Sequence, residues 1–199
     1  MMQIAIARHG ETELNERRRF QSASDVPLNC AGRKQAEALA IWVMKFKPTF
    51  VLTSPLVRAK QTAEIVAIPL GLDVNVDGRL REREVRDYEG LSIIGLGRLR
   101  EAAGHRFKDP TQDWDTVPSV ESDRKIFHRF LGAIKAIDAR QRERVLAVTH
   151  AGVAKSVFHE VFGVSPNRSC VLKVRNGGVL LLDRKADDNW TFLGLWNPL

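Results

Sequence analysis

The chain has 199 residues, of which 44% are hydrophobic and 28% charged, a composition that excludes a disordered protein and predicts a single domain over residues 1–199. No apolar run approaches the ~20 residues that span a bilayer, and Arg8 and His9 interrupt the first apolar stretch, so neither a membrane partner nor a secretory signal is expected. The net charge of +7 favours anionic partners without choosing among them.

Short apolar runs alternate with amphipathic segments through most of the chain. In chain order they predict a strand at 3–7, a helix at 32–46, a strand at 50–53, a helix at 55–67, a strand at 72–76, a helix at 121–141, a strand at 145–149 and a helix at 152–162. Ser54 is expected to cap the helix that starts at Pro55. This alternation predicts an α/β fold, a three-layer αβα sandwich with a mostly parallel central sheet.

The pattern changes after Gly163. Runs at 169–174, 179–183 and 191–196 predict strands, and Asn176-Gly177-Gly178 predicts a hairpin turn, so antiparallel edge strands are expected near the C-terminus. Residues 104–120 show no clear period, and we interpret them as a long surface segment that could act as a lid.

The two cysteines, Cys30 and Cys170, are too few for a disulfide framework and lack zinc-like spacing. This favours the reducing cytoplasm. His159-Glu160 lacks the second histidine of a zinc-protease motif. Neither a metal nor a cofactor is therefore expected.

Two histidines occupy equivalent positions, since His9 follows the 3–7 strand and His150 follows the 145–149 strand. In open α/β sheets, ligands bind beyond the carboxyl ends of the strands. If those two strands are neighbours, both imidazoles project into one crevice.

Arginines accompany these histidines. Arg8 precedes His9, and Arg58 lies in the first turn of the helix after the 50–53 strand. Guanidinium forks and helix N-termini both suit a phosphate, and the amide of Asn15 adds a donor. Each residue has an ordinary alternative, because a histidine after a strand is more often structural and such an arginine is usually a surface charge. Their convergence at several strand ends favours an anion site.

A set of motifs across residues 4–152 resembles the histidine phosphatase superfamily, the phosphoglycerate mutase-like proteins, and within it the small phosphatases. In order these are Arg8-His9-Gly10-Glu11-Thr12 with Asn15, Asp25-Val26-Pro27-Leu28 with Gly32, Gln35 and Ala36, Ser54-Pro55-Leu56-Val57-Arg58-Ala59 with Thr62-Ala63, Leu80-Arg81-Glu82 with Glu89-Gly90, and His150-Ala151-Gly152.

The resemblance implies a role for each matching residue. His9 would be the nucleophile that takes up a phosphoryl group, and Glu82 the proton donor. Arg8, Arg58 and His150 would surround the phosphate. The residues that we expect to bind substrate beside this catalytic set are Asn15, Gln21, Ser22 and Ala151.

Physical chemistry is consistent with these roles. Neighbouring cations keep a histidine neutral, and a carbonyl that holds one ring nitrogen leaves the other free to attack. Glu82 would protonate the leaving group and then act as base on water. Glu82 also lies in a charged stretch that could simply be solvated, and Glu84 and Glu89 are alternatives for the acid role.

Some positions depart from the family pattern. Ser22 and Arg86 stand where relatives commonly have Gly, and Ser119-Val120 replaces a frequent Gly-Gly. These changes reshape the rim, so a relative's substrate does not transfer. His105, Arg106 and Lys108 could reach a second anionic group, although surface charge is the more ordinary explanation.

The function that these features predict is a metal-independent phosphomonoester hydrolase acting on a small phosphorylated metabolite. A phosphoglycerate mutase is the nearest alternative, but such mutases tend to be longer and carry an Arg-His-Tyr-Gly-like stretch where this chain has Arg86-Asp87-Tyr88-Glu89-Gly90. A phosphate-ligand sensor, or a nucleic-acid binder using Arg17, Arg18, Arg19 and the basic cluster at 79–86, belongs to a different class. No nucleic-acid partner is expected, because no recognised motif is present. The oligomeric state is open.

Overall fold

A computed structural model of the chain describes residues 1–92, 120–138, 143–164 and 172–198. Its centre is a six-stranded sheet in the order β3-β2-β4-β1-β5-β6. The strands are β1 (Met2–Arg8), β2 (Phe50–Thr53), β3 (Val74–Val76), β4 (Arg144–Thr149), β5 (Val179–Arg184) and β6 (Trp190–Trp196). Strands β3, β2, β4 and β1 pair in parallel, whereas β5 and β6 are antiparallel at one edge, as the sequence predicts.

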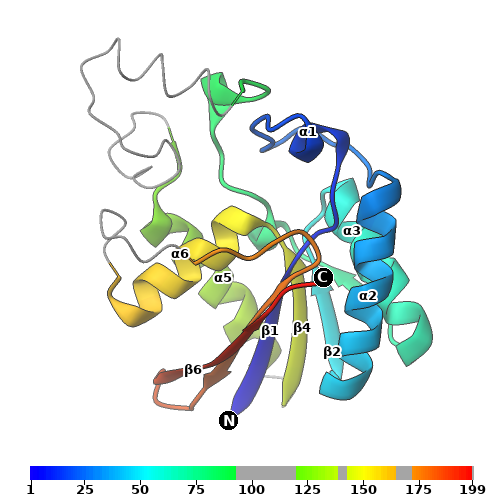
Figure 1. Ribbon diagram of the computed structural model, residues 1–199. Helices are drawn as coiled ribbons and strands as arrows, with labels where there is room; N and C mark the ends of the chain where they lie inside the picture. Colours follow the sequence, from blue (N-terminus) through cyan, green and yellow to red (C-terminus); the bar gives the residue numbers. More distant parts are fainter. Residues whose placement is uncertain (93–119, 139–142, 165–171, 199) are drawn as a thin grey trace.

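Helices cover both faces of this sheet (Figure 1). One face carries α2 (Cys30–Phe46) and α3 (Val57–Ala67), and the other carries α5 (Asp123–Asp138) and α6 (Ala151–Phe162). Short elements complete the described chain, namely α1 (Glu13–Glu16) and the 3-10 helices η1 (Ile68–Leu70), η2 (Gly78–Leu80) and η3 (Arg86–Tyr88). The three-layer sandwich predicted from the sequence is confirmed.

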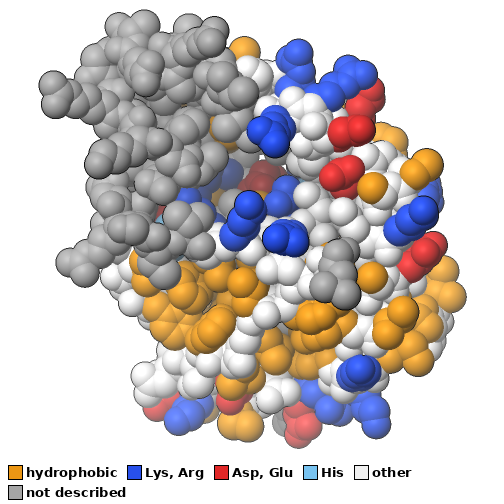
Figure 2. All heavy atoms as spheres, in the orientation of Figure 1, with side chains coloured by type: hydrophobic (Ala, Val, Ile, Leu, Met, Phe, Trp, Pro, Cys, Tyr) orange, Lys and Arg blue, Asp and Glu red, His pale blue; other side chains and the backbone are white. Residues whose placement is uncertain are grey.

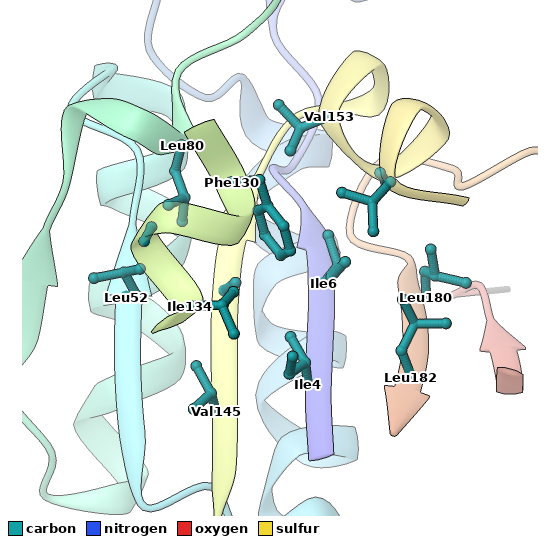
Figure 3. Packing of buried hydrophobic residues seen from close by; sticks show 14 of the residues in the cluster. Ile4, Ile6, Leu52, Leu80, Phe130, Ile134, Val145, Val153, Leu180 and Leu182 are labelled. Carbon is teal, nitrogen blue, oxygen red and sulfur yellow. The ribbon is translucent and has the colours of Figure 1, made fainter. Parts of the chain in front are cut away.

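The alternation of side chains along β1 presents residues of different size to the helices on the two faces of the sheet. Ile4 and Ile6 point toward α5 and α6, where Phe130 and Ile134 pack against them (Figure 3). The intervening alanines, Ala5 and Ala7, point toward α2 and α3. Successive side chains of a strand face opposite sides, so this period-two pattern places bulky residues in one layer and lets the other helices approach closely.

Two predictions about local structure are wrong. Helix α3 begins at Val57 with Leu56 as its N-cap, so Ser54 is not the N-cap residue of this helix. Of the strand expected at 169–174, residues 172–174 lie outside any strand and the others are outside the described residues. The turn at Asn176-Gly177 therefore leads into β5 without forming the expected hairpin. Residues 104–119 of the interpreted surface segment also fall outside the described residues.

The loop after β1 lies directly against α2. A Cβ atom on Gly10 would stand 2.3 Å from the carbonyl oxygen of Gly32, and one on Gly32 would stand 2.1 Å from that of Glu11. Backbone atoms cannot move aside as a flexible side chain can. Two glycines are therefore needed where the chain leaves β1, which fixes the position of the residues around His9.

We predict that alanine substitutions at two helical glycines change the stability of the protein in opposite directions. Gly32→Ala should destabilise the protein by about 1–3 kcal/mol, because the new methyl group meets backbone. Gly132→Ala in α5 is the matched control, since its Cβ would come no nearer than 3.6 Å to Arg79 Nη1. Because alanine favours a helix more than glycine does, Gly132→Ala should stabilise the protein by up to ~1 kcal/mol. Urea unfolding measures both, and equal effects of the two variants would contradict the close-approach explanation.

Candidate active site

The pairing of β1 with β4 brings the two histidines together. Arg8 lies opposite Thr149 in this parallel pair, so the next residue of each strand is a histidine at the same edge of the sheet. The rings of His9 and His150 are 5.1 Å apart between centroids at an interplanar angle of 62°. Both are buried. The two imidazoles therefore lie together beyond the ends of these strands, as expected if the strands are neighbours.

The geometry around His9 defines which of its nitrogens can react. Nδ1 lies 2.6 Å from the carbonyl oxygen of Gly10. A carbonyl can only accept, so this contact assigns the ring proton to Nδ1 and leaves the lone pair on Nε2. Burial, followed by the charges of Arg58 and Arg8, holds the pKa of His9 well below its usual value. The side chain is therefore a neutral imidazole with Nε2 free.

Arg58 is a fully buried cation beside this imidazole. Its guanidinium donates to the carbonyl oxygens of Ser22 at 2.9 Å and Ser24 at 2.7 Å. Burial lowers its pKa to about 10, so it remains charged at neutral pH. Glu89 in turn accepts hydrogen bonds from the backbone N–H groups of Ser22 and Ser24, at 3.0 and 3.2 Å. The carboxylate of Glu89 thus anchors the loop that holds Arg58.

Arg8 supplies the second cation from the end of β1. One of its terminal nitrogens donates to the carbonyl oxygen of Val174 at 3.1 Å. Burial lowers its pKa, and the negative charge of Glu82 opposes that effect. Within the described residues, the buried Nε atoms of both Arg8 and Arg58 have no acceptor. Buried donors normally have a hydrogen-bond acceptor, so these two unpartnered nitrogens indicate room for an anion.

Glu82 is the carboxylate that faces these arginines. Its oxygens accept from the backbone N–H groups of Arg83 at 2.7 Å and Gly152 at 3.2 Å. Its charge raises the pKa of both Arg8 and Arg58. A Cβ on Gly152 would stand 2.2 Å from Glu82 Oε1, so glycine is needed for this approach.

The two alternative acids are occupied elsewhere. Glu84 is exposed and pairs with Arg86, and Glu89 anchors the loop at Ser22 and Ser24. Arg86 has φ +41°, a left-handed backbone conformation that favours glycine.

A buried polar cluster lies behind Glu82, and sequence reasoning missed it. The guanidinium of Arg83 forms an ion pair with Asp123 and donates to Ser156 Oγ at 2.9 Å. His159 Nδ1 lies 2.9 Å from the other oxygen of Asp123. Although burial alone would raise it, the contacts with His159 and Arg83 hold the pKa of Asp123 below its usual value. This cluster holds Arg83, the residue that follows Glu82, against residues of α5 and α6.

The residues expected to bind substrate are placed in different ways. Asn15 Oδ1 accepts from Thr12 N–H at 3.2 Å, and the residue belongs to the capping box of α1. Gln21 Oε1 accepts from Thr12 Oγ1 at 2.8 Å, while its buried Nε2 has no partner among the described residues. Ala151 is the first residue of α6, where backbone N–H groups have no partner inside the helix.

Ser22 differs from the other three, because the protein already engages its polar groups. Its hydroxyl donates to the carbonyl oxygen of Arg83 at 2.6 Å, its N–H bonds to Glu89, and its carbonyl accepts from Arg58. A substrate contact through any of these groups would compete with an existing bond.

Two hydroxyl residues at the site were not singled out as site residues from the sequence. Thr62 Oγ1 accepts from the N–H of Gly10 at 3.0 Å and donates to the carbonyl oxygen of Arg58 at 2.7 Å. Ser54 Oγ lies 2.8 Å from Nε2 of His150. Their position within the Ser54–Thr62 motif was the available signal, but Ser54 was explained as a helix cap.

The surface above the carboxyl ends of the strands is hollowed. Figure 2 shows basic and acidic side chains inside this recess and further Lys and Arg side chains at its border. Among the described residues, no group of three or more His, Cys, Asp or Glu side chains could hold a metal ion. None of the helices in the described ranges is long and apolar enough to cross a bilayer.

A pair of imidazoles, two buried guanidinium groups and a carboxylate form an arrangement that can bind an anion such as a phosphate. Comparisons with known proteins agree. The family described as "Histidine phosphatase superfamily (branch 1)" matches residues 4–197. The chain belongs to this superfamily, whose members catalyse phosphoryl hydrolysis or transfer.

Some individual relatives are named as phosphoglycerate mutases or mutase-like proteins, and others as phosphatases. The chain is 36% identical over 200 residues to phosphoglycerate mutase-like protein 4 of Arabidopsis thaliana, covering 99% of this chain and 85% of that one. It is 30% identical over 195 residues to a probable phosphoglycerate mutase GpmB of Salmonella paratyphi C, covering 98% and 90%. A mycobacterial glucosyl-3-phosphoglycerate phosphatase, solved with VO3, superposes with a TM-score of 0.84 at 25% identity over 100% of both chains.

The lowered pKa values predict an unusual titration. The imidazole NMR signals of His9 and His150 should stay at their neutral positions as the pH falls from 8 to about 6, whereas a histidine in an unfolded chain titrates near ~6.5. Because the unfolded chain then binds more protons than the folded one, stability should decline as the pH falls below ~6.5. A titration midpoint for His9 at or above that value would contradict the neutral nucleophile.

Proposed function

We propose that the protein is a metal-independent phosphomonoester hydrolase that acts through a phosphohistidine at His9. One observation carries this proposal: a neutral, buried imidazole with a free Nε2 stands beside two buried arginines, Arg8 and Arg58, that retain unpartnered donors in the described part of the chain. A nucleophile that lacks charge can approach a phosphate dianion, and the fixed cations stabilise the charge that spreads over its oxygens.

In the first step, Nε2 of His9 attacks the phosphorus atom and the ester P–O bond breaks. The leaving oxygen takes a proton from the carboxylic acid of Glu82. The guanidinium groups of Arg8 and Arg58, with His150, bind the equatorial oxygens. Arginine forks provide this stabilisation without a metal ion, which is the basis for proposing metal independence.

In the second step, water attacks the phosphorus atom of phospho-His9 and the N–P bond breaks. Glu82, now a carboxylate, accepts a proton from the water, so inorganic phosphate leaves and the starting enzyme returns. The backbone N–H groups of Arg83 and Gly152 that hold Glu82 in place are suited to its charged form.

A mutase would return the phosphoryl group to a second hydroxyl of the substrate. The names of the curated relatives favour this alternative. The Arg86-Asp87-Tyr88 stretch, which stands where such mutases carry an Arg-His-Tyr-Gly-like stretch, favours hydrolysis. Incubation with 3-phosphoglycerate distinguishes them: release of phosphate faster than formation of the 2-isomer supports a hydrolase, and the reverse order supports a mutase.

We further propose a small phosphorylated metabolite as substrate and a reducing cytoplasm as the place of action. Phosphoglycerate occurs in the names of a mutase-like relative and of a phosphatase of similar structure, so phosphoglycerates and their glycosylated forms come first in a substrate screen. Sugar phosphates, nucleotides and phosphorylated cofactors complete it. If wild type turned over none of these, a phosphate-ligand sensor would be favoured, and salt-sensitive nucleic-acid binding unaffected by His9→Ala would favour a nucleic-acid binder.

The role of Glu82 predicts a dependence on the leaving group. Glu82→Gln should slow hydrolysis of an alkyl phosphate by about 10²–10⁴-fold but affect an activated aryl phosphate much less, because an aryl leaving group needs little protonation. Steady-state rates on the two substrates measure this. Glu84→Gln, which removes an exposed carboxylate two residues away, is the control and should change neither rate. Equal losses on both substrates would remove Glu82 from the acid role.

A further inference from the structure

Ser54 is the first residue after β2, and it is fully buried. Its N–H donates to the carbonyl oxygen of Val148 in β4 at 3.0 Å, which fixes the residue beside the strand that ends at His150. Its hydroxyl oxygen lies 2.8 Å from Nε2 of His150 and 3.4 Å from the backbone nitrogen of Leu56. This contact is independent of the bond that orients His9.

Each direction of this contact leaves one donor without a partner among the described residues of the free protein, and a bound anion can decide between the two. A serine hydroxyl has one proton and two lone pairs. Leu56 N–H can only donate, so it takes a lone pair of Ser54 and leaves the hydroxyl proton free to point at Nε2 of His150. The opposite direction would give the hydroxyl a second donor and leave its own proton without an acceptor among the contacts of the described residues.

His150 has a single ring proton, which makes this direction matter. Burial, followed by the charge of Arg58, holds the pKa of His150 well below its usual value, so the ring is neutral. If Nε2 accepts from Ser54, the proton resides on Nδ1. That nitrogen is buried and has no partner within the described residues. In this tautomer, Nδ1–H of His150 is a donor near Arg8 and Arg58 that is available to an anion.

We propose that Ser54 is a positioning residue that fixes the tautomer of His150, so that Nδ1–H donates to an oxygen of the bound phosphoryl group. The identity of the acceptor rests on the proposed function, whereas the tautomer does not. With the other tautomer, a lone pair on Nδ1 would face the anion and repel it. A buried N–H without a partner is costly, and a bound phosphoryl oxygen removes that cost.

Nitrogen NMR of the free protein tests the tautomer directly, because protonated and bare imidazole nitrogens resonate far apart. In wild type, Nδ1 of His150 should give the protonated signal and Nε2 the bare one. Addition of inorganic phosphate should shift the Nδ1–H signal. Finding the proton on Nε2 of His150 in wild type would overturn the proposal, whatever happens in any variant.

Variants add a functional readout. Ser54→Ala should move part of the His150 population to the other tautomer and lower kcat/KM by about 10–100-fold, as loss of an orienting partner typically does. Ser54→Thr, which keeps a hydroxyl, should restore the wild-type nitrogen signals. The control is Thr53→Val, which removes a neighbouring buried hydroxyl that bonds only backbone carbonyls in the described contacts. A loss of activity in Ser54→Ala with unchanged His150 signals would contradict the mechanism.

Failure of this inference can be told apart from failure of the proposed function. A wild-type protein with the proton on Nδ1 and a phosphate-induced shift, but no turnover of any phosphate ester, would refute only the hydrolase. A protein that hydrolyses esters through His9 while His150 carries its proton on Nε2 would refute only the role of Ser54.

Discussion

The hydrogen bond between His9 Nδ1 and the carbonyl oxygen of Gly10 is the interaction on which the site depends. It leaves Nε2 as the free nitrogen, and burial keeps the ring neutral. The loop that carries Gly10 is in backbone contact with α2, an approach that glycine at positions 10 and 32 makes possible. One layer of the sandwich therefore packs against the loop that orients His9.

Electrostatics gives the site its second property, a surplus of buried positive charge around neutral imidazoles. Arg58 is held by carbonyl oxygens of the Ser22–Ser24 loop, which Glu89 anchors from behind. Carbonyl dipoles fix the guanidinium without neutralising it. The site is thus preorganised for an anion, since its cations need not move or lose a counter-ion when a phosphate binds.

Much of this arrangement could be predicted from local sequence. The strands that end at His9 and His150 are short apolar runs, and parallel neighbours place their carboxyl ends together, so the two imidazoles were expected to meet if these strands are neighbours. The pairing of β1 with β4 supplies that condition. The contacts of Ser54 and the Arg83–Asp123 cluster could not be predicted in this way, because they join positions far apart in the chain whose side chains have no periodicity. The expected strand at 169–174 was wrong for residues 172–174, because an apolar run and a glycine turn are equally compatible with a loop that supplies the Val174 carbonyl to Arg8.

The central claim, that an imidazole becomes covalently phosphorylated, is tested most directly by mass spectrometry of enzyme quenched in alkali within milliseconds of mixing with a turned-over ester. The account predicts one acid-labile phosphoryl group, located on the peptide that contains His9 and formed no more slowly than phosphate is released. Steady release of phosphate with no adduct at any time, or an adduct on a different residue, would contradict it.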